Sequence, residues 1–191
     1  DLLLAVQAPS LRTVAALRPG SMLIAMLYPA KLPGLLELLC ERRITAFAME
    51  TVPRISRAQS MDALSSQAGL GGHKAVLLAA SHLDKYFPLM MTAAGTIQPA
   101  KVVIMGAGVA GLNAIATAKR LGAVVEVSDV RPAVKEQVAS LGGRFIEVDL
   151  GEAGEGEGGY ARELTPEQLE KQKAVVRERV VAADVVITTA L

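Results

Sequence analysis

Val102-Val103-Ile104-Met105-Gly106-Ala107-Gly108-Val109-Ala110-Gly111 is an apolar, β-branched run that breaks into the pattern G-x-G-x-x-G. A helix-forming stretch follows from Leu112 to Leu121, and a second apolar run, Val124 to Ser128, ends in Asp129. Strand, glycine turn, helix and second strand with an acidic tip are the parts of a dinucleotide-binding βαβ unit, at the spacing that such a unit needs. The sequence therefore predicts an α/β fold whose doubly wound parallel sheet binds a dinucleotide.

The three glycines have different physical tasks in this interpretation. Gly106 permits a tight turn that a side chain would obstruct, and Gly108 lets the backbone approach a pyrophosphate. Gly111 lets the helix lie close to the strand. The pyrophosphate then binds the free N–H groups at the positive end of the helix.

The acidic residue at the second strand tip indicates which dinucleotide binds. Asp129 can accept hydrogen bonds from the adenosine ribose, and its charge would repel a 2′-phosphate, which favours NAD(H). Arg131 argues the other way, because an arginine near this position can bind a 2′-phosphate. We give Asp129 priority because it occupies the strand tip itself.

Composition excludes several classes of protein. The chain has 191 residues, a net charge of +1 and no basic cluster, so nucleic acid is not expected as a ligand. The sequence shows no metal-ligand cluster, so no metal is expected either. The apolar stretches are too short to cross a membrane, and no signal peptide is present. The single cysteine, Cys40, excludes an intrachain disulfide, and we expect a buried thiol in a cytoplasmic protein.

Two Rossmann-like domains joined by a helical bridge are expected along the chain. Residues 1–57 alternate strands (2–6, 22–27, 45–49) with helices (11–17, capped by Ser10, and 35–43), as the incomplete C-terminal part of a first α/β domain would. Residues 58–95 form the bridge, with helices at 59–67 and 74–86 separated by Gly69, Gly71 and Gly72. Residues 96–191 form the dinucleotide-binding domain, truncated at its C-terminal end, so that the chain is a segment of a longer protein.

Four strands and three helices are predicted in that last domain. The strands cover 102–105, 124–128, 144–148 and 184–188, and the helices cover 109–121, 132–141 and 166–182. Ligands bind outside the carboxyl ends of such strands, which places Gly106, Asp129, Asp149 and Thr188–Thr189 on one rim. The acidic, glycine-rich stretch 150–159 leads to Tyr160, and composition alone allows either a solvated connector or a lid over the cofactor.

Several longer strings carry a resemblance to a known family. They are Met49-Glu50-Thr51-Val52-Pro53-Arg54-Ile55-Ser56-Arg57-Ala58-Gln59-Ser60-Met61-Asp62, Met91-Thr92-Ala93-Ala94-Gly95-Thr96, Ala114 to Ala123, Gly159-Tyr160-Ala161 and Ile187 to Leu191. Together they closely resemble the NAD(H)-binding component, domain I on the alpha or alpha-1 subunit, of proton-translocating NAD(P)+ transhydrogenase. That component belongs with alanine dehydrogenase in one family.

The resemblance implies an enzyme that passes a hydride from NADH to NADP+ with AB stereospecificity. Protons cross a membrane through a separate domain or subunit, and NADP(H) is held by a partner, domain III. The resemblance also implies a homodimer that is peripheral on the cytoplasmic face of the membrane, or on the matrix side in a mitochondrion.

Site residues follow from the resemblance, position by position. Arg54 and Gln59 resemble the pair that positions the nicotinamide, with Gln59 reaching toward the NADP(H) ribose, while Asp62 and Ser65 resemble the residues that hold the carboxamide and orient the ring. Tyr160 completes the expected catalytic set. The expected cofactor contacts also include Ile55, Ser56, Ser60, Met61, Gly106, Gly108, Val109, Gly111, Asp129, Val130, Arg131, Gly159, Gln172 and Leu191.

The chemistry agrees with this residue set and leaves alternatives open. Hydride transfer between two nicotinamides moves no proton at the reacting carbons, so it needs positioned rings rather than a general acid or base. His73 and His82 are isolated and are expected to be structural or solvated and not catalytic. Arg54 and Asp62 could otherwise form a simple ion pair that braces the bridge. The rival functions are an alanine dehydrogenase and an NAD(H)-sensing module without catalysis.

Overall fold

Two hydrophobic cores organise the computed structural model, which describes residues 1–148 and 165–189. Contacts between Cα atoms divide the chain into two units, Asp1–Ser66 and Gln67–Leu191. Both are α/β units with parallel sheets, which confirms the predicted fold class.

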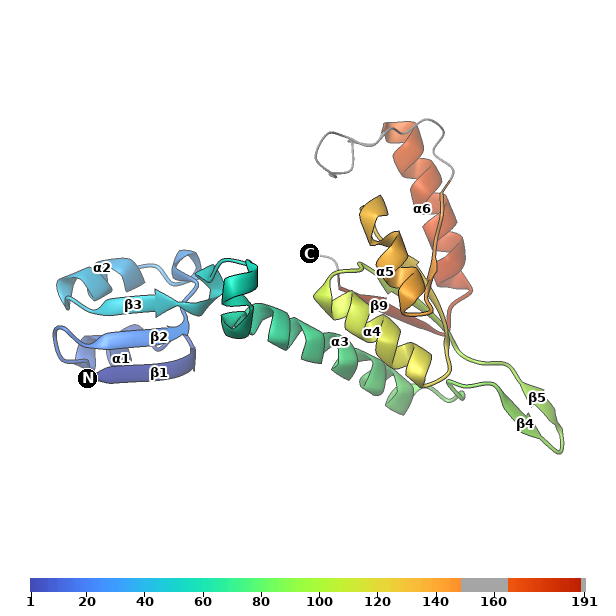
Figure 1. Ribbon diagram of the computed structural model, residues 1–191, viewed down its shortest axis with the longest axis horizontal. Coiled ribbons are helices and arrows are strands. Elements are labelled where there is room, and N and C mark those ends of the chain that lie inside the picture. The colour runs from blue at the N-terminus through green and yellow to red at the C-terminus, as the bar shows by residue number, and fades with distance from the viewer. Residues whose placement is uncertain (149–164, 190–191) are drawn as a thin grey trace. The chain divides into compact units, whose positions relative to one another are not determined.

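A three-stranded parallel sheet forms the first unit, in the order β1 (Leu2–Gln7), β2 (Met22–Met26) and β3 (Thr45–Ala48) (Figure 1). Helices α1 (Leu11–Ala16) and α2 (Leu35–Glu41) connect the strands and contact each other. The predicted cap is confirmed, because the Ser10 hydroxyl accepts a hydrogen bond from the Thr13 N–H at 3.2 Å. Short 3₁₀ helices η1 (Pro29–Lys31), η2 (Met49–Thr51) and η3 (Ser56–Met61) complete the unit.

The two faces of this sheet differ in burial. Side chains alternate between the faces of a strand, and Leu23 and Ala25 pack with Val14, Leu35 and Leu39 into the core of this unit. Apolar side chains also alternate on the other face, where Leu4, Val6 and Phe47 are 66%, 83% and 52% exposed. Helices therefore cover one face of the sheet within this unit.

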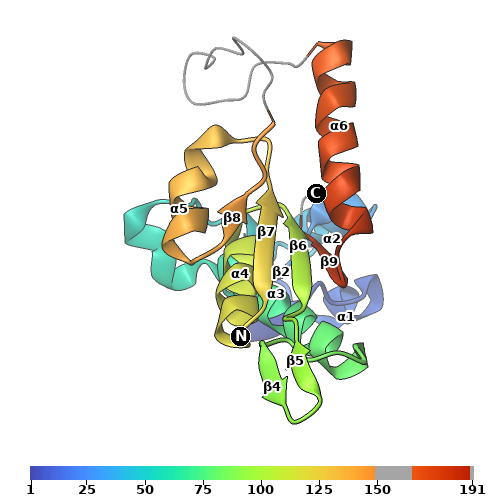
Figure 2. The same ribbon diagram turned by 90° about the vertical axis from the view of Figure 1, so that its right-hand side faces the viewer.

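A four-stranded parallel sheet forms the second unit, in the order β8 (Arg144–Phe145), β7 (Val124–Ser128), β6 (Lys101–Met105) and β9 (Val185–Thr188) (Figure 2). The chain moves outward from β6 to β7 and β8 and then returns to the other side of β6. The carboxyl ends of β6 and β9 therefore flank the point where the strand order reverses, which is where ligands bind in open sheets of this kind.

Helices cover both faces of the second sheet, since the adjacent Val102 and Val103 are both 1% exposed. Helix α4 (Val109–Arg120) contacts β6 and β7. Helix α5 (Lys135–Ser140) contacts β8 and the short helix η4 (Pro132–Val134) that precedes it. Helix α6 (Pro166–Val181) begins at a capping box of Thr165 and Gln168. Val125 and Val127 of β7 point to the face of the sheet that α4 covers, so Glu126 between them points to the other face. Glu126 forms an ion pair with Arg179 of α6, which places α6 on that other face.

The predicted break in the bridge is wrong, because α3 (Ala63–His82) is one continuous helix through its glycines. Gly72 faces α4 so closely that an added Cβ atom would lie 1.9 Å from the Ala110 carbonyl oxygen. A Cβ atom on Gly69 would lie 3.2 Å from Asn113 Nδ2. These glycines permit close helix packing, whereas sequence reasoning treated them as helix breakers.

Two further expectations are corrected. A hairpin of β4 (Met90–Thr92) and β5 (Gly95–Ile97) was not predicted, because its strands are only three residues long (Figure 1). Cys40 is exposed rather than buried, because it lies on the side of α2 opposite the core residues. The remaining predicted strands and helices are present within the described residues, and their ends agree to within three residues, with 132–141 divided into η4 and α5.

Candidate functional site

The glycine turn between β6 and α4 is held by backbone geometry. Gly106 has φ +102°, a left-handed conformation that favours glycine, and its N–H donates to the Ser128 carbonyl at 2.8 Å. A Cβ atom on Gly111 would lie 1.8 Å from the Gly106 carbonyl oxygen, so only glycine lets α4 start this close to the turn. Gly108 precedes the first residue of α4, and space is open beside it.

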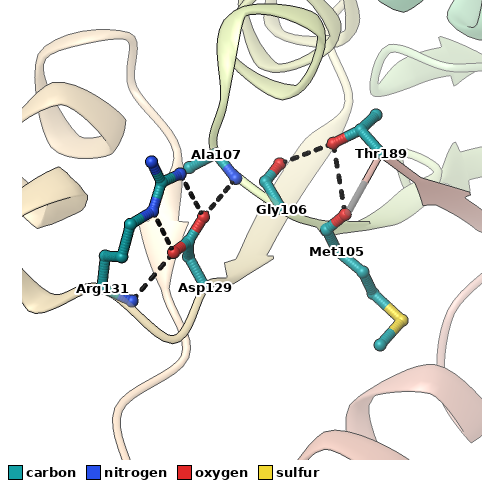
Figure 3. Close-up of polar contacts among 6 residues, drawn as sticks. All are labelled: Met105, Gly106, Ala107, Asp129, Arg131 and Thr189. Atoms are coloured by element: carbon teal, nitrogen blue, oxygen red, sulfur yellow. Dashed lines mark hydrogen bonds and ion pairs between the residues drawn. The ribbon is translucent and has the colours of Figure 1, made fainter. Parts of the chain in front are cut away.

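Asp129 fixes the other side of the turn (Figure 3). Its Oδ2 atom accepts from the Ala107 N–H at 2.7 Å and from Arg131 Nη2 at 2.9 Å. Its Oδ1 atom accepts from the Arg131 N–H at 2.8 Å and from Arg131 Nε at 3.0 Å. The carboxylate that follows β7 is thus hydrogen-bonded to the loop that follows β6.

Burial and hydrogen bonding have opposite effects on the pKa of Asp129. Only 5% of the Asp129 side chain is exposed, against 49% for Arg131. Burial raises the pKa of Asp129, but the hydrogen bonds from the Arg131 side chain and from the Ala107 and Arg131 N–H groups outweigh it and lower the pKa overall. Asp129 is therefore ionised at neutral pH.

Thr189 closes the turn from a third strand. Its N–H donates to the Met105 carbonyl at 2.8 Å. Its hydroxyl donates to the carbonyls of Gly106 at 2.9 Å and Met105 at 3.2 Å (Figure 3). These bonds point two carbonyl groups of the turn toward β9. Sequence reasoning placed Thr189 on the rim without a role, and only the strand order shows that role.

In the first unit, Asp62 and Ser65 form the start of α3. Asp62 Oδ1 accepts from the Ser65 N–H at 2.9 Å and Oδ2 accepts from the Ser65 hydroxyl at 2.6 Å. The hydroxyl bond of Ser65, followed by its N–H bond, lowers the pKa of Asp62, and the Arg54 charge adds to the effect. The structure thus brings Asp62 and Ser65 together as a helix cap, with Arg54 close enough to act electrostatically.

The rest of this segment is open to solvent. Arg54, Ile55, Ser56, Gln59, Ser60 and Met61 are exposed around η3, while Ala58 is buried at 4%. An amide and a guanidinium that are accessible in this way are free to contact a ligand. Within the unit, these side chains therefore lie on the surface and not in the core.

Family models match almost the whole chain. The model described as "Alanine dehydrogenase/PNT, N-terminal domain" matches residues 1–71, and "Alanine dehydrogenase/PNT, C-terminal domain" matches residues 75–191. The chain belongs to the alanine dehydrogenase/PNT family.

Relatives within the alanine dehydrogenase/PNT family differ in how closely they match. An NAD(P) transhydrogenase alpha subunit of Rhodospirillum rubrum is 53% identical over 93% of this chain and 47% of its own length. A crystal structure of a transhydrogenase from Sinorhizobium meliloti matches with a TM-score of 0.83 at 47% identity, over 100% of this chain and 50% of that one. Alanine dehydrogenase of Mycobacterium tuberculosis is 32% identical over 68% of this chain and 35% of its own length. The chain therefore spans about half or less of these relatives.

Other predicted residues of this alanine dehydrogenase/PNT chain lie on the rim, on α6 or beyond the described residues. Val109 and Val130 are 42% and 67% exposed beside the turn. Gln172 is half-buried on α6. Asp149, Gly159, Tyr160 and Leu191 lie outside the described residues.

Glu50 makes structural hydrogen bonds that the sequence analysis did not predict, although the residue stands in the family motif. Its carboxylate accepts from the Leu27 N–H at 2.9 Å and the Tyr28 N–H at 2.6 Å, beyond the end of β2. Tyr28 has φ +41°, an unusual conformation that these bonds support. The position of Glu50, an acidic residue just after a predicted parallel strand, could have indicated that it binds backbone N–H groups beyond the neighbouring strand.

Other candidate chemistry is limited in the described part of the chain. No group of three His, Cys, Asp or Glu side chains there is placed to hold a metal ion, and no helix there has the length and apolarity of a membrane span. A pocket of about 220 Å³ lies near α6 and includes Lys101, Val124 and Arg144, at the amino ends of the strands. It is therefore at the opposite end of the sheet from the glycine turn.

Proposed function

We propose that this alanine dehydrogenase/PNT chain is the NAD(H)-binding component of a proton-translocating transhydrogenase. The observation that carries the proposal is the glycine turn at the switch point of the β8-β7-β6-β9 sheet. It presents the start of α4, and the acidic Asp129 stands at the tip of the next strand. The choice of a transhydrogenase is supported by 53% identity to the Rhodospirillum subunit, against 32% to the alanine dehydrogenase.

The turn fits a dinucleotide on its own geometry. The first N–H groups of a helix have no partner within it, and they favour an anion. The N–H groups of Gly106 and Ala107 are already bonded to Ser128 and Asp129, so the pyrophosphate would bind the following ones, around Gly108 and Val109. Open space beside Gly108 leaves room for it, and residues 96–191 would form the NAD(H) domain.

When bound, NADH supplies a hydride for NADP+ on a partner domain. This chain contributes orientation: Arg54 and Gln59 would position the nicotinamide, and Asp62 and Ser65 would hold its carboxamide. Because the Ser65 bonds lower the pKa of Asp62, its carboxylate stays ionised at neutral pH and can accept an amide N–H. No side chain has to gain or lose a proton in such a transfer.

The proposal extends to partners that the resemblance implies. They are a second copy of the chain, an NADP(H)-binding domain and a membrane domain that conducts protons. The component would then be peripheral on the cytoplasmic face of that membrane, and Tyr160 would belong to its catalytic set.

Stopped-flow absorbance tests the activity. The full-length protein is mixed with a separately prepared NADP(H)-binding domain, and hydride transfer from NADH to bound NADP+ is followed. Rapid transfer that requires the partner is the expected result, with pyruvate plus ammonium as the control acceptor.

Two other outcomes would reject the transhydrogenase proposal. Turnover with pyruvate and ammonium alone would identify an alanine dehydrogenase. Binding of NADH without turnover under any of these conditions would identify a sensing module.

A further inference from the structure

All four acceptor positions of the Asp129 carboxylate are filled. A carboxylate has about two acceptor sites on each oxygen. Ala107 N–H and Arg131 Nη2 occupy those of Oδ2, while the Arg131 N–H and Nε occupy those of Oδ1 (Figure 3). A ribose hydroxyl therefore finds no free acceptor on Asp129 in this arrangement.

The four bonds differ in how easily they are broken. The Ala107 and Arg131 N–H groups belong to the backbone of the two strand ends, so they cannot leave without unfolding the turn. The Nε and Nη2 groups belong to a side chain that is 49% exposed, and solvent can replace its contacts. A ribose can reach Asp129 only by displacing the Arg131 side chain.

The paired arrangement has a different ligand preference. Arg131 neutralises the Asp129 charge, which removes the repulsion of a 2′-phosphate. Its Nη1 group donates to no residue in the described part of the chain, and an exposed guanidinium binds phosphate well. The paired state therefore favours a 2′-phosphate, whereas the unpaired state favours a free 2′-hydroxyl.

We propose that Arg131 is the specificity-determining residue of this site, because its side chain switches Asp129 between a neutral pair and an open carboxylate. The proposal rests on the dinucleotide site proposed above. It assigns discrimination to the displacement of Arg131, whereas the sequence analysis weighed Asp129 and Arg131 as separate groups and gave priority to Asp129.

The test measures two ligands that differ only in the 2′-phosphate. Calorimetry with the full-length protein gives the Kd of ADP-ribose and of 2′-phospho-ADP-ribose for the wild type and Arg131→Gln. We expect Arg131→Gln to bind ADP-ribose about two- to fivefold more tightly, since the competing exposed pair is gone. We expect it to bind 2′-phospho-ADP-ribose about tenfold more weakly, since a charge-assisted bond is lost.

Two further variants separate specificity from simple charge and folding effects. Arg120→Gln removes the same charge at the far end of α4 and should leave both Kd values unchanged. Arg131→Lys keeps the positive charge but cannot form the bidentate pair with Asp129, so it should bind ADP-ribose more tightly than the wild type does. Its affinity for 2′-phospho-ADP-ribose should fall less than that of Arg131→Gln. Thermal unfolding of each variant confirms that it is folded.

The outcomes distinguish the two proposals. If the Kd of ADP-ribose and the Kd of 2′-phospho-ADP-ribose change in the same direction in Arg131→Gln, and again in Arg131→Lys, then Arg131 has only a structural role and the specificity proposal is wrong. If the wild type binds neither ligand, the dinucleotide site itself is wrong, and this proposal is rejected with it.

Discussion

Single acidic residues connect distant segments of this chain through their carboxylates. Asp129 binds the loop that follows β6, and Glu50 binds two N–H groups beyond β2. Asp184 Oδ2 accepts from Lys85 Nζ at 2.7 Å and from the Lys101 N–H at 2.8 Å, so it ties the start of β6 to a residue near the end of α3. Each of these acidic side chains therefore has a structural task that is separate from any ligand.

Asp184 makes stability depend on pH. The hydrogen bond from Lys85, then that from the Lys101 N–H, lowers the pKa of Asp184 below 3.8. A lowered pKa stabilises the fold above the unfolded value and loses that effect as pH falls through the folded value. Asp184→Asn should therefore reduce the free energy of unfolding by about 1 kcal/mol at pH 7, and less near pH 3.

Urea denaturation at both pH values measures this difference. Glu170→Gln is the control, because its pair with Lys173 lies on exposed side chains of α6 and should contribute little. Equal stability of Asp184→Asn and the wild type at pH 7 would show that the pair has no net effect.

Helix α3 shows at the element scale why local patterns fail. Four residues, Gly69-Leu70-Gly71-Gly72, contain three glycines, and glycine lowers helix propensity. Packing against α4 overrides that propensity, since Val76 is fully buried and Gly72 contacts the backbone of Ala110. The predicted interruption came from counting residue types without knowing the neighbouring helix.

Neighbouring glycines of α3 should respond in opposite ways to alanine. A Cβ atom on Gly71 meets nothing within 4 Å, so Gly71→Ala should stabilise the protein by about 0.5–1 kcal/mol through helix propensity. A Cβ atom on Gly72 would overlap the Ala110 carbonyl, so Gly72→Ala should destabilise it by about 1–3 kcal/mol.

The midpoint of urea unfolding for the two variants checks both signs. Because the residues are adjacent, the comparison controls for helix position and solvent conditions. Similar stabilities for the two variants would mean that α3 and α4 do not pack as described.

At the scale of the whole molecule, the sequence predicted the parallel sheets well and the close contacts poorly. The glycine turn, the two flanking strands and the acidic tip are local patterns, so Gly106, Gly111 and Asp129 lie where expected. The pairing of Asp129 with Arg131 depends on side-chain conformation, and the hydrogen bonds from Thr189 to the turn depend on strand order. The spacing of residues in the sequence encodes neither. The roles of Arg54, Gln59 and Tyr160 stay predictions.

Gln59 offers a test of the proposed assembly with an NADP(H)-binding partner. Gln59→Asn keeps the amide but shortens the side chain, so it should slow hydride transfer to the partner much more than it weakens NADH binding. Stopped-flow rates and the Kd of NADH measure the two effects separately. Gln67→Asn makes the same change on exposed α3 surface and should affect neither quantity. Equal losses of rate and affinity in Gln59→Asn would remove Gln59 from the transfer site.

The hydrogen bonds from the Thr189 hydroxyl to Met105 and Gly106 have a consequence for biosynthesis. Met105 and Thr189 are separated by 84 positions, so their contact closes a long loop, and such contacts form late. During translation the entire G-x-G-x-x-G motif leaves the ribosome well before β9 is made. A nascent chain at that stage contains every glycine of the motif, but the bonds from Thr189 to the turn are not yet made, so binding at the proposed nucleotide site would begin only after β9 has joined the sheet.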